Sequence, residues 1–198
     1  MKRIGLLSDT HSWWDDKYLF HFNDCDEIWH AGDIGSMRII EQLEAHCPVR
    51  AVCGNIDGSD VRFRFKEIAR FRVEDCNVLM KHIGGYPGRY DASIRRTLYQ
   101  EQPQLFISGH SHILKIEYDK LINCLHINPG AAGKQGWQQV RTLVKFTING
   151  CKFEDLVQSV SPLFFAVLYF CISRQSAYVC GLRRHEGPDL LGQRLRGF

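Results

Sequence analysis

The sequence predicts a single-domain α/β fold in which parallel strands alternate with helices. The chain has 198 residues, 44% of them hydrophobic and 24% charged, which suits one globular domain with a buried core. In its first half, strand-like runs alternate with a helix-like run, an order typical of parallel strands joined by crossovers. A short polar motif follows each of these runs, at the place where ligands gather in open α/β sheets.

Three strands and one helix are predicted in the first half. The strand-like runs are Ile4–Leu7, Glu27–His30 and Val49–Cys53. Between the last two, Ser36–Cys47 places Ile39, Ile40 and Leu43 at helical spacing, so this segment is predicted to be a helix. Ser36 is the expected N-cap, because its side-chain oxygen can accept a hydrogen bond from the first turn.

The second half is predicted to contain more strands than helices. Its strand-like runs are Ile68–Val73, Val78–His82, Leu105–Ser108, Ile113–Tyr118 and Leu121–Ile127. Ala92–Gln102 is predicted to be a helix that ends before Pro103, because proline disfavours a helical residue in front of it. Leu143–Ile148 and Cys151–Glu154 flank Asn149-Gly150, and Asn-Gly favours a hairpin turn with two positive φ angles.

Charge and cysteine content argue against several classes of protein. Residues 1–155 hold 20 Lys and Arg against 20 Asp and Glu, and this neutral balance disfavours broad nucleic-acid binding. The eight Cys are scattered without a Cys-x-x-Cys motif, which indicates reduced, mostly buried thiols. The chain starts Met-Lys-Arg and enters a strand at once, so we expect a cytoplasmic protein without a secretion signal or a membrane segment.

Polar side chains with metal-binding chemistry follow the strand-like runs. They are Asp9, His11, Asp33, Asn55, His82, His110 and His112. Carboxylate, amide and imidazole groups together suit divalent first-row metals. In Asp9-x-His11 and His110-x-His112, the alternation of an extended chain places both side chains on one side. Each fragment alone is more simply a capped loop, but the full set, each member after a strand-like run, favours a metal site.

The same motifs resemble those of a known family. Asp9-x-His11, Gly32-Asp33, Gly54-Asn55-x-Asp57, His82 and Gly109-His110-x-His112 resemble the signature of the calcineurin-like metallophosphoesterase superfamily. The short length and Asn128-Pro129-Gly130 are similar to its small YfcE-type bacterial phosphodiesterases. The resemblance covers about residues 1–155. It implies a four-layer α-β-β-α sandwich with two mixed sheets flanked by helices.

The resemblance also implies the chemistry. It places Asp9, His11 and His112 on one metal ion, Asn55, His82 and His110 on another, and Asp33 as the bridge. Asp33, Asn55 and His110 are the expected catalytic residues. The implied reaction is phosphodiester hydrolysis by in-line attack of a hydroxide that bridges the two ions. We expect manganese, with iron, cobalt, nickel and zinc as alternatives, and a small phosphodiester as substrate.

Two positions depart from the family pattern. Many members carry His after the motif Asn as an acid toward the leaving group, whereas this chain has Ile56, which cannot donate a proton. His82 is followed by Ile83 where the family usually has Gly. Arg89 and Tyr90 are interpreted either as contacts to a substrate phosphate or as a solvated loop.

Three further polar residues lie in or near the motifs without a certain role. His30 is either a support for the metal ligands or a structural residue at a strand end. Asp57 is either a residue that orients Asn55 or a ligand His, or a turn residue. His126 lies on an apolar strand and is interpreted as a core histidine with satisfied hydrogen bonds.

The domain prediction is a catalytic domain over residues 1–155 and a C-terminal tail over residues 156–198. Leu163–Ile172 is an apolar run that is read either as a buried segment or as part of an appended, non-native sequence without a catalytic part. Alternative functions are a phosphomonoesterase or nuclease on the same scaffold, or a non-catalytic module like the metallophosphoesterase-like subunit of the retromer coat. A homo-oligomer is left open.

Overall fold

A computed structural model describes residues 1–161, 166–173 and 176–184, and within these ranges two mixed β-sheets form the centre of the molecule. In the first sheet the strand order is β14-β13-β12-β11-β1-β2-β3. These strands are β1 (Lys2–Leu7), β2 (Glu27–His30), β3 (Val49–Ala51), β11 (Arg141–Asn149), β12 (Lys152–Ser161), β13 (Ala166–Ser173) and β14 (Ser176–Arg184). The predicted parallel crossovers are confirmed, because β1 pairs parallel with β2 and β2 with β3.

The second sheet has the strand order β4-β5-β8-β10-β9. Its strands are β4 (Ile68–Val73), β5 (Cys76–Lys81), β8 (Leu105–Ile107), β9 (Leu114–Asp119) and β10 (Cys124–Pro129). β5, β8 and β10 run parallel, whereas β4 and β9 pair antiparallel at the two edges. A small separate hairpin is formed by β6 (Gly85–Tyr86) and β7 (Arg89–Tyr90).

The main hydrophobic core lies between the two sheets. Alternate residues of the strands point into it, such as Ile4 and Leu6 of β1 and Val78 and Met80 of β5. Trp29 of β2 is fully buried there, and its ring meets Phe71 of the second sheet edge to face, with the ring centroids 5.0 Å apart. The apolar inner face of each sheet therefore explains why the two sheets pack against each other.

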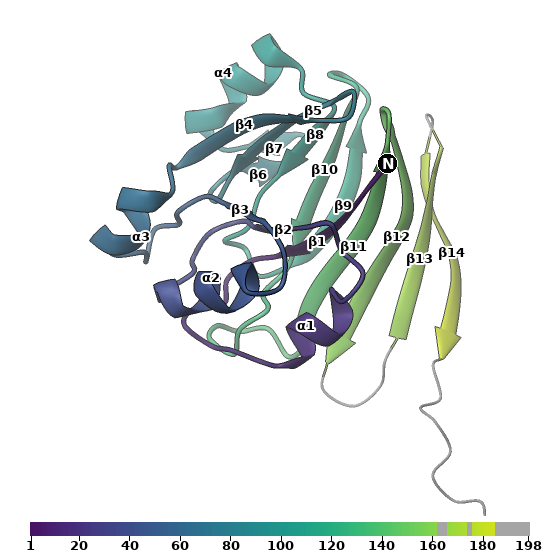
Figure 1. The fold of residues 1–198 in the computed structure, drawn as a ribbon. Coiled ribbons are helices and arrows are strands. Elements are labelled where there is room, and N and C mark those ends of the chain that lie inside the picture. The colour runs from purple at the N-terminus through teal and green to yellow at the C-terminus, as the bar shows by residue number, and fades with distance from the viewer. Residues whose placement is uncertain (162–165, 174–175, 185–198) are drawn as a thin grey trace, which may run out of the picture.

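Helices cover the outer faces, and the four-layer α-β-β-α arrangement predicted from the family resemblance is confirmed (Figure 1). α1 (Lys17–His21) and α2 (Met37–Glu44) lie on the first sheet, and α4 (Ala92–Glu101) lies on the second. The Ser36 side chain accepts a hydrogen bond from Arg38 N, so the predicted N-cap is confirmed. α1, α3 (Ser59–Arg64), β6 and β7 were not predicted, because each is too short to show a period in the sequence.

The hairpin between β11 and β12 differs from the prediction. Asn149 pairs with Lys152, so the two loop residues are Gly150 and Cys151, and of these only Gly150 has a positive φ. The predicted Asn149-Gly150 turn with two positive φ values is therefore wrong by one residue. β12 also continues to Ser161 and pairs with β13, so the predicted domain boundary at residue 155 falls inside a strand. Part of the apolar run, residues 162–165, lies outside the described residues.

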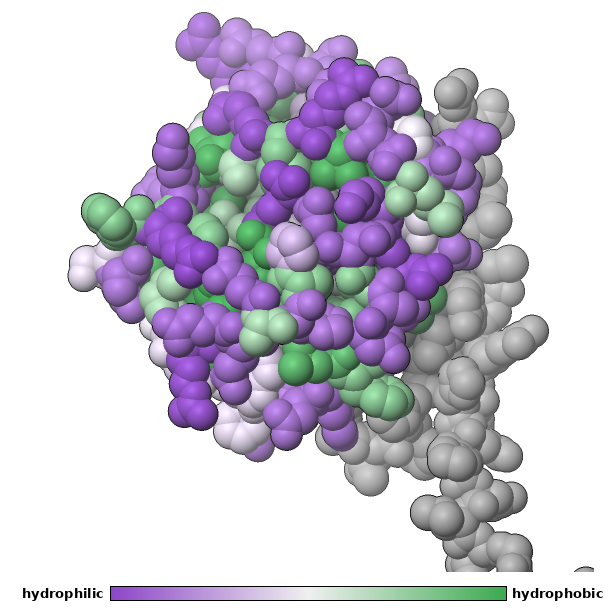
Figure 2. Space-filling view, viewed as in Figure 1, coloured by the Kyte–Doolittle hydropathy of each residue, from purple (hydrophilic) through white to green (hydrophobic). Residues whose placement is uncertain are grey.

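The face shown in Figure 2 is mostly hydrophilic, and its hydrophobic residues appear in separate groups. The cysteines whose side chains the structure describes are free, and four of them (Cys25, Cys53, Cys76 and Cys124) are buried, as predicted. Across the described ranges no helix has the length and apolar character that crossing a membrane would require.

Candidate metal centre

The predicted ligands lie on loops that follow the strands of both sheets. Asp9 and His11 follow β1, Asp33 follows β2, Asn55 follows β3, His82 follows β5, and His110 and His112 follow β8. These strands are parallel within each sheet, so their carboxyl ends lie at the same edge of the sandwich. Residues more than 100 positions apart in the sequence therefore meet at one place.

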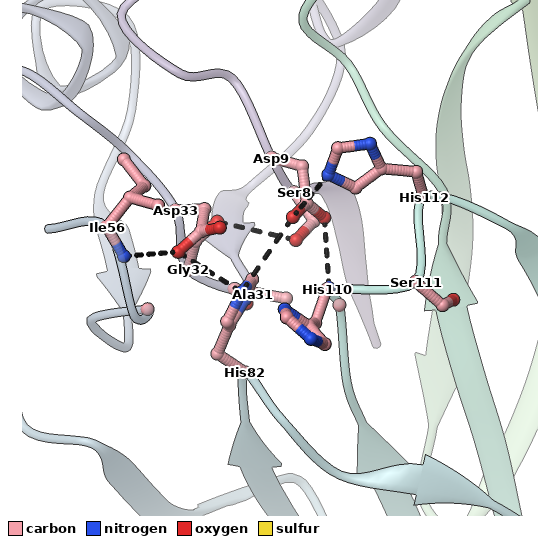
Figure 3. A network of polar contacts seen from close by, with 12 residues as sticks. Ser8, Asp9, Ala31, Gly32, Asp33, Ile56, His82, His110, Ser111 and His112 are labelled. Carbon is pink, nitrogen blue, oxygen red and sulfur yellow. Dashed lines mark hydrogen bonds and ion pairs between the residues drawn. The ribbon is translucent and has the colours of Figure 1, made fainter. Parts of the chain in front are cut away.

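Six of the seven predicted ligands form two triads. The first triad is Asp9, His11 and His112, and the second is Asp33, His82 and His110. Within each triad the candidate ligand atoms all lie within 4.8 Å of one another. Figure 3 shows Asp9 between His112 on one side and Asp33 and His82 on the other.

Asp33 faces both triads. Its Oδ1 lies 3.2 Å from Nε2 of His82 in the second triad, and its Oδ2 lies 3.8 Å from Nε2 of His11 in the first. Asp9 is almost as central, because its Oδ1 lies 3.3 Å from Nε2 of His112 and 3.8 Å from Nε2 of His82. Two carboxylates thus lie among the imidazoles of both triads.

The donor set fits metal ions. Asp9 Oδ1 and His82 Nε2 are both buried, and their contacts with groups of the triads, at 3.2 to 3.8 Å, do not have hydrogen-bond geometry among the described residues. A buried polar atom without a partner is costly, and an ion bound at that place is one established reason for it. Oxygen and imidazole nitrogen together are the ligands that divalent first-row metals accept.

The backbone of the triads is held in an unusual conformation. Five of the six triad residues have positive φ angles, from 47° at His11 to 69° at His110. For residues other than glycine this left-handed region costs free energy and is concentrated at functional sites. Hydrogen bonds between the loops hold it, including His11 N to Asp33 O at 3.0 Å and His110 N to Asp9 Oδ2 at 3.2 Å.

Hydrogen bonds outside the triads fix the orientation of two imidazoles. His82 Nδ1 donates to the carbonyl of Ala31 at 2.7 Å. The amide of Gln138 donates to the carbonyls of Gly133 and Gln135, so its Oε1 accepts from His112 Nδ1 at 2.9 Å. In both rings the Nε2 atom therefore faces the triads, as a metal ligand requires. Gln138 could not be found from the sequence, because it lies outside every motif.

His30 and Asp57 are not among the triad residues, but each joins two ligand loops. His30 is fully buried, and its ring bonds Thr10 Oγ1 at 2.9 Å and accepts from Gly32 N at 3.2 Å. Burial lowers the pKa of His30 to about 4, so its ring is neutral at neutral pH. Asp57 accepts from Gly35 N and Gly54 N, both at 2.7 Å. Asp57 therefore orients the backbone of these two loops. It does not orient the side chain of Asn55 or of a ligand His.

Close approach of the loops explains two of the motif glycines. A Cβ on Gly54 would collide with the Asp33 side chain, and a Cβ on Gly109 would collide with Ser8 and approach His82 Nδ1 to 3.0 Å. Neither glycine has a positive φ, so a special backbone angle is not the reason for it. They provide space for the neighbouring loop.

The pKa shifts follow the pairing of carboxylates with imidazoles. Burial acts to lower the pKa of His82, but the neighbouring Asp33 and Asp9 outweigh it, and the pKa is raised. Burial acts to raise the pKa of Asp33, but His82 outweighs it, and the pKa is lowered. Contact with Asp9 raises the pKa of His112. A cation that binds here replaces protons, so acidic solution opposes metal binding.

Other predicted residues lie around the triads. Asn55 and the 45% exposed Ile56 are on the surface beside Asp33, where Ile56 N donates to Asp33 Oδ1 at 3.1 Å. Tyr90 is buried and its hydroxyl donates to Asp119 at 2.9 Å, so it is not a residue of a solvated loop, whereas Arg89 is exposed. His126 is a core residue as interpreted, but its hydrogen bonds are not all satisfied, because Nδ1 has no partner among the described residues.

Two cavities adjoin the second triad. The smaller cavity, of about 280 Å³, is lined by residues that include Asn55, Arg62, Lys81 and His82. The larger cavity, of about 490 Å³, is lined by residues that include Tyr86, Arg89, His110, Ser111, Lys115 and Asn128. Ile83 and Asp91 line both cavities and separate them.

Comparisons with known proteins agree with the geometry. The model of the calcineurin-like phosphoesterase superfamily domain matches residues 1–150. A protein of Methanothermobacter thermautotrophicus named "Probable metallophosphoesterase" is 34% identical over an alignment of 137 positions that covers 65% of this chain and 76% of that protein. A probable metallophosphoesterase of Methanocaldococcus jannaschii is 32% identical over an alignment of 134 positions that covers 65% of this chain and 67% of that protein.

Solved structures share the fold. An archaeal phosphodiesterase superposes with a TM-score of 0.63 at 21% identity, over 80% of this chain and 99% of its own. Zinc-bound Vps29 of Entamoeba histolytica superposes with a TM-score of 0.63 at 15% identity, over 92% of this chain and 97% of its own. Because the family model spans residues 1–150, the predicted resemblance is confirmed: the chain belongs to the calcineurin-like phosphoesterase superfamily and is a metal-dependent phosphoesterase.

Proposed function

We propose that this protein is a phosphodiesterase that uses two divalent metal ions. The proposed ligands are Asp9, His11 and His112 for one ion and Asn55, His82 and His110 for the other, with Asp33 between them. The observation that carries the proposal is the position of Asp33, whose two carboxylate oxygens face His82 of one triad and His11 of the other. A carboxylate in this position can hold two ions close together, as in known two-metal sites.

The ions would supply a hydroxide nucleophile at neutral pH and neutralise charge on the phosphoryl oxygens. The chain's own part is to position the ester. Asn55 lines the smaller cavity together with His82, where its amide can donate a hydrogen bond to a phosphoryl oxygen. Ile56, the next residue, is partly exposed and offers no side-chain proton to a leaving group. Substrates whose leaving group departs as a stable anion are therefore favoured.

Two features favour a diester over a monoester. A diester has two organic arms on its phosphorus, and two cavities adjoin the second triad, one beside His82 and one beside His110. A diester also carries less negative charge than a monoester, and the carboxylates of Asp9 and Asp33 are both buried at the centre. Repulsion between like charges is strong where water is excluded.

Manganese is the proposed metal, with iron, cobalt, nickel and zinc as alternatives, because mixed oxygen and nitrogen ligands accept all of them. The zinc-bound state of Vps29 shows that a protein of this fold binds a divalent ion. We further propose that residues 1–155 carry out the catalysis and that residues 156–198 take no part in it.

The proposal is tested with matched chromogenic esters. Turnover of bis(p-nitrophenyl) phosphate and p-nitrophenyl phosphate is measured in metal-depleted protein before and after manganese is added. We expect activity only with metal, and a higher kcat/KM for the diester. A higher kcat/KM for the monoester would contradict the diester preference. Metal binding without turnover of any ester would favour a non-catalytic interaction module.

A further inference from the structure

The two cavities beside the second triad differ in how their cationic side chains are used. In the smaller cavity, Arg62 donates to the carbonyls of Asp57 and Gly54 at 2.9 and 2.7 Å and forms an ion pair with Glu67 at 3.2 Å. Lys81 Nζ donates to Ser93 Oγ at 2.5 Å. Both cations of this cavity are thus already engaged in structural contacts.

The larger cavity has a cationic side chain that is unpaired among the residues that the structure describes. Arg89, on β7, is exposed at its lining, and its side chain has no hydrogen bond or ion pair within residues 1–161, 166–173 and 176–184. Lys115, on β9, is the second cation, with Nζ 3.0 Å from Glu117 Oε2 and 3.6 Å from the centre of the Tyr86 ring. Asp91 is the acidic residue of the lining, and its carboxylate accepts hydrogen bonds from Ser93 N and Oγ.

The position of this cavity connects it to the proposed reaction. His110 of the second triad and Ser111 both line it, so an ester bound at the triad can extend an arm toward Arg89. A volume of about 490 Å³ lies within the range of pockets that hold small organic molecules. The half-buried ring of Tyr86 offers an apolar wall for the organic part of such an arm.

We propose that the larger cavity binds one arm of the phosphodiester, and that this arm carries a second negative charge which pairs with Arg89. The proposal rests on the proposed phosphodiesterase function and narrows its substrate class. The substrates are diesters with an additional anionic group, a phosphate or a carboxylate, beyond the bond that is cleaved. Arg89 suits this role because its planar guanidinium binds such groups through two hydrogen bonds.

The experiment compares two esters that differ in one group. Thymidine 5′-(p-nitrophenyl phosphate) is measured with and without a 3′-phosphate, in the manganese-loaded full chain. We expect the 3′-phosphate to lower KM by about five-fold, the size typical of one partly exposed ion pair. In Arg89→Met the ratio of the two KM values should fall toward one. Arg96→Met, which removes the same charge from the exposed surface of α4, is the matched control and should keep the ratio.

The outcomes separate this proposal from the function on which it rests. Metal-dependent turnover of both esters with equal KM values in the wild type would overturn the proposal that a charged arm pairs with Arg89 (the charged-arm proposal). It would leave the phosphodiesterase proposal intact. A preserved ratio in Arg89→Met would show that another group binds the phosphate. If neither ester is hydrolysed, the phosphodiesterase proposal fails and the charged-arm proposal falls with it. Thermal unfolding of both variants checks that they are folded.

Discussion

Gln138 provides a sensitive test of the proposed first metal site, because it holds one ligand without being one. Its Oε1 accepts from His112 Nδ1 at 2.9 Å, while its amide nitrogen is bound to two backbone carbonyls. Changing Gln138 to Met keeps the approximate size of the side chain and removes the acceptor. The His112 ring then loses the contact that directs Nε2 toward Asp9 and His11.

The expected loss follows from the geometry. Substitution of a residue that supports a metal ligand typically costs 10- to 100-fold in metal affinity. His112 is half-buried, so water can replace part of the lost hydrogen bond, and we expect the lower end of that range. The predicted loss is therefore about ten-fold for one of the two sites. Gln138→Glu keeps an acceptor for His112 and should lose less.

Titration of metal-depleted protein with cobalt measures this effect, because the visible absorption of bound cobalt reports on its ligands. Gln139→Met is the matched control, since Gln139 is exposed and adjacent. We expect weaker binding at one site in Gln138→Met and unchanged binding in Gln139→Met. Equal affinities in the wild type and Gln138→Met would contradict a supporting role for Gln138, as would an equal loss in the control.

Three other predictions follow from the same structure. Ile56→His should raise kcat/KM for diesters with poorer leaving groups, and an unchanged dependence of rate on leaving-group pKa would contradict this. Burial lowers the pKa of His126 to about 3, so below pH 6.5 the unfolded chain takes up a proton that the folded chain does not. The free energy of unfolding should therefore fall by about 2 kcal/mol between pH 6.5 and pH 5. Denaturant titrations at the two pH values should show a smaller fall in His126→Gln. A chain that ends at residue 161 keeps β12 whole and should bind metal and turn over diester like the full chain. Loss of folding or activity in this shortened chain would show that the later strands belong to the catalytic domain.

Long strands and the motifs that follow them could be predicted from sequence. Ile68–Val73 was predicted with the bounds that β4 has, because its length and β-branched residues give a clear signal. The seven candidate ligands could also be found, because metal-binding side chains after successive strands are a pattern that random loops do not produce. Six of them meet in the two triads, and Asn55 lies beside them on the wall of the smaller cavity.

What could not be predicted depends on contacts between distant segments. Gln138 contacts His112 across 26 positions in the sequence, and no motif links them. The sequence could not decide between the two roles considered for Asp57. The deciding contact is the hydrogen bond from Gly35 N, which lies 22 positions away in the sequence. Helices of five or six residues, such as α1 and α3, are too short for a hydrophobic period. The cavities could not be predicted either, since their walls come from separate strands.

The number of metal ions that each chain binds decides whether this is a two-metal centre. Metal-depleted protein is titrated with manganese, and bound metal per chain is measured for the wild type and for Asp33→Asn. We predict two ions per wild-type chain, and a folded Asp33→Asn protein that loses metal and turnover, because the carboxylate that faces both triads is gone. Binding of one ion or none by the wild type, or full metal content and activity in Asp33→Asn, would contradict it.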